Sequence, residues 1–148
     1  MNDEGALEFV DTNVMVYAHD SSTGKKHELA KDLVHRLWDS RKGCLSIQVL
    51  QEFYVTVTHK VAKPLDPDVA KELVQDLALW RLHAPEAADV VGAIDLQRKH
   101  SISFWDAMIL WSAGRLGCKI VWSEDLNSGQ RYEGVRVASP FTPEALST

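Results

Sequence analysis

Short apolar runs alternate along the chain with longer stretches in which apolar residues recur every three or four positions. The first run, residues 7–10, is mostly apolar and predicts a short strand. The apolar run 14–18 follows it and is compatible with a helix, and Asp11 lies at the junction between the two. This order of strand and then helix recurs to the end of the chain, which predicts a series of βαβ units.

Five later stretches carry the apolar stripe, the capping residues or the terminators that are typical of helices. The predicted helices span 25–41, a region that includes 50–61, then 68–80, 86–100 and 104–116. Gly43 and Gly117 are expected to end the first and the last of them. Short runs between the helices predict strands at 44–46, 81–84, 119–122 and 135–137.

This alternation indicates an α/β fold in which a central, mostly parallel sheet carries helices on both faces. At 148 residues, the chain is expected to form a single domain over 1–148. Right-handed crossovers place the carboxyl ends of the parallel strands along one edge of the sheet. Ligands bind at that edge in open α/β sheets, so the polar residues that follow the strands are the candidate site.

The predicted helix 104–116 is unusual because its first half is almost entirely apolar, with Asp106 as the only charge. A helix that is apolar on every side is buried, and an unpaired charge is costly to bury there. Ser103 and Asp106 have the spacing of a capping box, which is compatible with a metal-ligand role for the same carboxylate. Asp11 has the same two interpretations, a helix cap or a ligand.

Four carboxylates follow strands or lie in the first turns of the next helix, and we expect them to converge at the edge of the sheet. They are Asp11, Glu52, Asp106 and Asp125. Carboxylates in one cleft repel one another unless a cation neutralises them. Oxygen ligands without Cys or His suit Mg²⁺ or Mn²⁺, and a metal held in this way is suited to hydrolysis of a phosphodiester.

Three acidic residues leave alternatives open at this point. Glu52 lies off the apolar stripe of its helix, so it is either a solvated side chain or part of the site. Glu124 adjoins Asp125 and competes with it for the fourth position in the site. Glu8, inside the first strand, has no role that the sequence explains.

Composition narrows the class of protein. The formal net charge of −5 argues against a protein that coats nucleic acid, but not against an enzyme that contacts a phosphodiester through a metal. No run approaches the roughly 18 apolar residues of a membrane span, and the acidic start of the chain lacks the apolar core of a signal peptide. We therefore expect a cytoplasmic protein without a membrane partner. Two cysteines are too few for a disulfide framework, and the six histidines lack zinc-type spacing.

Four motifs occur in order along the chain. They are Phe9-Val10-Asp11-Thr12-Asn13, then Glu52, then Ser103-Phe104-Trp105-Asp106-Ala107-Met108-Ile109, and finally Ser123-Glu124-Asp125-Leu126. Together they resemble the PIN-domain ribonucleases, and within that family the VapC-type toxins of bacterial toxin–antitoxin pairs. The resemblance covers roughly residues 6–141. It implies a three-layer α/β/α fold, endoribonuclease activity that depends on Mg²⁺ or Mn²⁺, a homodimer and a cognate antitoxin protein.

The resemblance also implies roles for individual residues. Asp11 and Asp106 would be the principal metal ligands, with Glu52 and Asp125 as further catalytic acids. Thr12 and Asn13 would support Asp11, and Ser123 would supply the hydroxyl of a Ser-x-Asp pattern. From charge alone, the candidate contacts to RNA phosphates are Lys25, Lys26, Arg98 and Lys99.

Two competing hypotheses remain for the function. In the first, the chain is a non-catalytic α/β module that binds a partner, and its acids are caps and solvated side chains. In the second, it is a phosphatase that acts on small phosphate esters.

Overall fold

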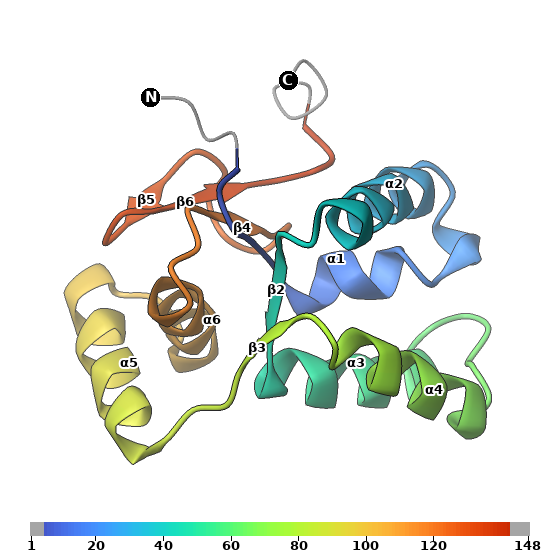
Figure 1. The fold of residues 1–148 in the computed structure, drawn as a ribbon, viewed down its shortest axis with the longest axis horizontal. Helices are drawn as coiled ribbons and strands as arrows, with labels where there is room; N and C mark the ends of the chain where they lie inside the picture. The colour runs from blue at the N-terminus through green and yellow to red at the C-terminus, as the bar shows by residue number, and fades with distance from the viewer. Residues whose placement is uncertain (1–4, 143–148) are drawn as a thin grey trace.

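The computed structural model describes residues 5–142, which form a six-stranded sheet between two groups of helices (Figure 1). The strands are β1 (Glu8–Val10), β2 (Gly43–Ser46), β3 (Arg81–His83), β4 (Ile120–Trp122), β5 (Arg131–Tyr132) and β6 (Val135–Ala138). The helices are α1 (Thr12–Tyr17), α2 (Lys25–Ser40), α3 (Ile47–His59), α4 (Pro67–Leu77), α5 (Ala87–His100) and α6 (Phe104–Arg115), with a short 3₁₀ turn η1 (Ser21–Thr23). In the part of the chain described, no helix has the length and apolar character needed to cross a membrane.

The sheet has the strand order β3-β2-β1-β4-β6-β5, and every neighbouring pair is parallel except β5 with β6. The central strand β1 lies beside β4, with Phe9 opposite Val121. The chain builds outward from β1 to β3 on one side and then crosses to β4 on the other. The order therefore reverses between β1 and β4, which is where ligands bind in sheets of this kind.

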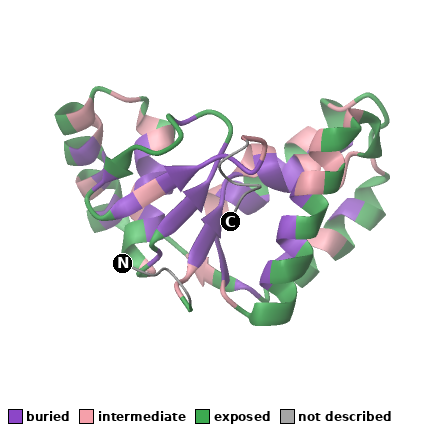
Figure 2. Cartoon of the chain, turned by 90° about the horizontal axis from the view of Figure 1, so that it is seen from above, coloured by how far each residue is buried: buried purple, intermediate pink, exposed green. Residues whose placement is uncertain are grey.

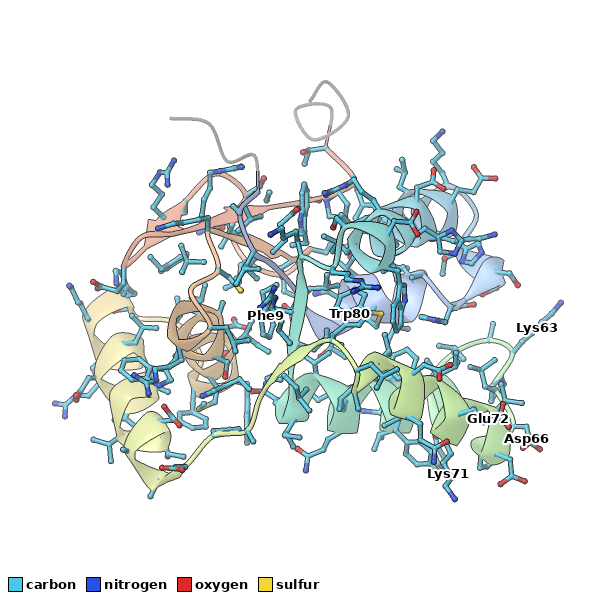
Figure 3. The ribbon with its side chains drawn as sticks, viewed as in Figure 1. Phe9, Lys63, Asp66, Lys71, Glu72 and Trp80 are labelled. Carbon is cyan, nitrogen blue, oxygen red and sulfur yellow. The ribbon has the colours of Figure 1, made fainter. Side chains whose placement is uncertain are left out.

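Helices cover both faces of the sheet, which confirms the expected α/β architecture with three layers. In Figure 1, α5 and α6 lie on one side of the strands, and α1 to α4 lie on the other. Figure 2 shows that the inner part of the sheet is buried, while the outer sides of the helices are exposed. The strands β1, β2, β4 and β6 are buried almost throughout, and the edge strands β3 and β5 are partly exposed. Phe9, labelled in Figure 3, is fully buried on the central strand between the two groups of helices.

One helix terminator differs from the expectation. Helix α2 ends at Ser40, and Arg41 follows it in the left-handed conformation with φ 60°. Gly43 is instead the first residue of β2, packed against the ring of Trp80. A Cβ atom at Gly43 would lie 2.5 Å from that ring, so the residue is needed for close packing and not for ending the helix.

Strand β5 is an element that the sequence pattern did not predict, because two residues are too few to show any alternation. It pairs with β6 through a tight turn at Glu133 and Gly134, whose φ values are 50° and 87°. Two consecutive positive φ values are typical of the turn that joins two antiparallel strands most tightly.

The structure explains Glu8. Its carboxylate is buried and accepts a hydrogen bond from the indole nitrogen of Trp122 at 2.8 Å. Arg36 on α2 donates two further hydrogen bonds to it, at 2.9 and 2.8 Å. A fork of this kind is among the stronger ion pairs in proteins, so Glu8 ties α2 to the two central strands.

Candidate active site

A cleft of about 700 Å³ lies at the carboxyl edge of β1 and β4, where helices α3 and α6 begin. Five acidic residues line it: Asp11, Asp20, Glu52, Asp106 and Asp125. All four acids selected from the sequence are therefore brought to one cleft, and Asp20 is an addition. Asp20 also caps η1, and no sequence signal distinguishes that role from a place in the cleft.

Asp11 is the most deeply placed of these acids, with 6% of its surface exposed. One carboxylate oxygen accepts the backbone N–H of Thr12 at 2.7 Å, so the residue caps α1 as one interpretation predicted. The other oxygen accepts the hydroxyl of Ser123 at 2.8 Å. Ser123 follows β4, so the contact joins the ends of two neighbouring strands and holds the carboxylate in one orientation.

The pKa of Asp11 is raised from 3.8 to about 6. Burial is the main cause, because it removes water from the charged form. The hydrogen bonds from Ser123 and Thr12 lower the pKa, while the negative charges of Asp125 and Glu52 raise it further. Asp11 therefore lies in a field of like charge, which a bound cation would relieve.

Glu52 lies on α3 with its carboxylate fastened to the site. The hydroxyl of Thr12 donates to it at 2.8 Å, and the amide of Gln48 donates at 3.4 Å. These contacts favour membership of the cleft over a merely solvated side chain. Thr12 thereby serves two acids, since its backbone N–H binds Asp11 and its hydroxyl binds Glu52. The side chain of Asn13 instead accepts the backbone N–H of Glu124 at 3.2 Å.

Asp106 lies in the first turn of α6, where its backbone N–H donates to the hydroxyl of Ser103 at 3.1 Å. Ser103 is thus the cap, and the Asp106 carboxylate lines the cleft without a hydrogen bond or ion pair to any residue from 5 to 142. The element before α6 is the helix α5, not a strand. Asp106 reaches the edge of the sheet because α6 starts there, and no strand end delivers it.

The geometry separates the two candidates for the fourth acid. Glu124 accepts hydrogen bonds from Tyr17 at 3.0 Å and from Lys26 at 2.6 Å, and it does not line the cleft. Asp125 does line it, and its backbone N–H donates to the hydroxyl of Ser123 at 3.1 Å. Asp125 is therefore the better candidate.

The cleft fits a hard divalent cation, because its titratable side chains are five carboxylates together with Tyr17 and Lys60, and carboxylate oxygens are the ligands that such a cation prefers. Within residues 5–142, no group of three or more His, Cys, Asp or Glu side chains is arranged to hold a metal ion on its own. Mg²⁺ is usually bound through one or two carboxylates, with waters and substrate phosphates as its other ligands. Asp11 and Asp106 would suffice for such a site.

Sequence reasoning missed several residues of the cleft. Lys60 and the amide residues Gln48 and Gln51 line it. The four cations selected from charge alone are absent from its lining, and two of them form ion pairs elsewhere, Lys26 with Glu124 and Lys99 with Glu133. The spacing of Gln48 from Glu52, one helical turn, is a signal that could have found it.

Comparison with known proteins identifies the family. The family model for the PIN domain matches residues 9–132, which is most of the chain, so the protein belongs to the PIN-domain family. The comparison with curated proteins gives no match.

Solved structures with the same fold include three from bacteria. One is VapC20 from Mycobacterium tuberculosis, a toxin described as cleaving the sarcin–ricin loop, with 22% identity and a TM-score of 0.66 over 87% of this chain and 98% of that one. A toxin–antitoxin complex from Klebsiella pneumoniae has 15% identity and a TM-score of 0.66, covering 90% and 98% of the two chains. The DNA-bound VapBC complex from Salmonella typhimurium has 16% identity and a TM-score of 0.64, covering 91% and 98%. At these identities the likeness concerns the fold.

Proposed function

We propose that this protein is an endoribonuclease that depends on Mg²⁺ or Mn²⁺ and serves as the toxin of a type II toxin–antitoxin pair. One observation carries the proposal. Four acids from separate parts of a PIN fold meet in one cleft at the point where the strand order reverses.

Asp11 and Asp106 would hold the cation. When bound, it would activate a water molecule and neutralise charge on the phosphodiester. Ser123 and the backbone of Thr12 keep the Asp11 carboxylate aimed into the cleft. Glu52 and Asp125 offer further carboxylate oxygens, which would accept hydrogen bonds from water in the site.

One buried hydrogen-bond donor of a cleft residue has no partner within residues 5–142. The side-chain nitrogen of Asn13 is buried and has no hydrogen-bond partner among the described residues. A buried donor without a partner is uncommon, because burying a donor that makes no hydrogen bond costs about 1–3 kcal/mol.

The proposed partners are RNA, a cognate antitoxin and a second copy of the chain. The RNA substrate is supported by the PIN-domain family and by the description of VapC20 as a toxin that cleaves the sarcin–ricin loop, and the antitoxin by the two solved toxin–antitoxin complexes. Co-expression with the product of a neighbouring reading frame should relieve toxicity. Light scattering at micromolar concentration should give the mass of a dimer, and a monomer would contradict that part.

Two substitutions test the catalytic proposal, Asp11→Asn and Asp106→Asn. Each keeps the shape of the side chain but removes the charge that a hard cation requires, so each should lower cleavage of total RNA by at least ~100-fold. The matched control is Glu124→Gln, which alters an acid outside the cleft and should leave cleavage within about threefold of the wild type. Cleavage is measured with Mg²⁺, with Mn²⁺ and with EDTA, and the RNA 5′ ends are sequenced. Asp11→Asn and Asp106→Asn proteins that cut at the wild-type rate would refute the proposal.

A further inference from the structure

Trp105 is the most exposed of the five tryptophans, with 62% of its surface open to solvent. The apolar pattern of α6 predicted burial on every side, and Trp105 is the residue that departs furthest from it. The indole lines the cleft directly beside Asp106. An exposed aromatic ring that lines a cleft beside Asp106 is placed where a bound substrate would cover it and remove its apolar surface from water.

Trp105 lines the cleft with its indole largely uncovered. Its backbone carbonyl accepts a hydrogen bond from the amide of Gln48 at 3.4 Å. Phe104 contacts the ring nearly at a right angle, with 5.0 Å between centroids and 76° between planes. No other aromatic ring in residues 5–142 contacts it, so no ring is stacked flat against the indole.

The charges around Trp105 indicate what kind of contact an RNA strand would need. Five acids line the cleft and Lys60 is the only Lys or Arg among its lining residues. Nucleic-acid binding normally draws much of its affinity from several basic residues on phosphates, and this cleft has a single one among its lining residues, Lys60. Stacking of a base on an aromatic ring does not depend on the phosphate charge, and every base has a face that can stack.

We propose that Trp105 binds one base of an unpaired RNA strand by stacking, and so positions the neighbouring phosphodiester over the acids. This inference rests on the ribonuclease activity proposed above. It assigns an unpaired substrate, because a base inside a duplex is already stacked on its neighbours. Trp105 is then a substrate-binding residue, and its contribution is to affinity more than to the chemical step.

The test compares Trp105→Ala with Trp105→Tyr and with Trp38→Ala. Trp38 is the next most exposed tryptophan at 37%, lies on α2 against Trp80 and does not line the cleft, so it controls for loss of an exposed indole. KM and kcat are measured on an unpaired RNA oligonucleotide. Binding of phosphorothioate oligo(A), which resists hydrolysis, is measured by the fluorescence anisotropy of an end-labelled oligonucleotide, and quenching of tryptophan fluorescence is recorded beside it. Melting temperatures confirm that the variants are folded.

Trp105→Ala should raise KM and the dissociation constant roughly 5- to 150-fold, with kcat within about threefold of the wild type. Trp105→Tyr should restore most of the affinity, and Trp38→Ala should match the wild type. Quenching of tryptophan fluorescence should be lost in both Trp105 variants and kept in Trp38→Ala. Equal affinities for Trp105→Ala and Trp38→Ala would overturn the inference. So would loss of self-association in Trp105→Ala with RNA affinity intact, since the ring would then belong to a protein interface. A wild type that neither cuts nor binds RNA would overturn the proposed function as well, whereas cleavage that is indifferent to Trp105 overturns the stacking alone.

Discussion

Asp11→Asn should change the stability of the metal-free protein in opposite directions at low and high pH. The folded protein holds the Asp11 proton more tightly than the unfolded chain, because the pKa rises from 3.8 to about 6 on folding. Below about pH 4 Asp11 is mostly protonated in both the folded and the unfolded state, so its ionisation does not lower the free energy of unfolding. As the pH rises from about 4 to 6, the unfolded state ionises first and the free energy of unfolding falls by about 3 kcal/mol. Above about pH 6 this loss is constant.

The asparagine does not titrate, but it loses a hydrogen bond. Both oxygens of Asp11 accept hydrogen bonds, from Thr12 and Ser123, and an amide has only one oxygen to offer. That loss costs about 1 kcal/mol. The variant should therefore be less stable than the wild type by about 1 kcal/mol near pH 4, and more stable by about 2 kcal/mol near pH 8.

Urea unfolding in EDTA at several pH values measures both differences. Asp32→Asn is the control, because Asp32 is an exposed acid on α2 and its replacement should give a small difference that does not reverse sign. With Mg²⁺ or Mn²⁺ at a hundredfold excess over its dissociation constant, the wild type should gain about 3 kcal/mol and Asp11→Asn much less. An asparagine variant that is less stable than the wild type at pH 8 in EDTA would refute this reasoning.

Two further predictions concern packing and are also measured by urea unfolding. Arg36→Ala should destabilise the fold by about 1–3 kcal/mol, because the buried carboxylate of Glu8 loses its cation. The control is Lys31→Ala, exposed on the same helix, which should change stability by less than about 0.5 kcal/mol. Similar values for the two would show that the pair is not stabilising. Gly92→Ala should cost about 1–3 kcal/mol, because its Cβ would lie 2.3 Å from the ring of Trp111. Gly114→Ala, in α6 with nothing within 4 Å, should stabilise by about 0.5–1 kcal/mol, and a shared sign for the two glycines would contradict the packing argument.

The sequence alone determined the local elements and the acids at their ends. Apolar periodicity is a property of neighbouring residues, so the helix 25–41 and the strand 119–122 were predicted within three residues of the observed α2 and β4. The same local patterns placed Asp11 after a strand and Asp106 in a first helical turn. The convergence of Asp11 and Asp125 followed from a general rule about parallel sheets. Asp106 joins them because α6 starts at the same edge, which that rule does not predict.

Tertiary structure decided which partners those residues have. Asp11 receives its second hydrogen bond from Ser123, which is 112 positions away, and Glu8 is neutralised by a guanidinium and an indole from two different elements. Two-residue β5 forms only because β6 is there to pair with it. The exposure of Trp105 likewise depends on how other segments pack around α6, which the apolar pattern of that helix does not record. Such contacts join residues far apart in sequence, and they depend on shape and packing that no local period records.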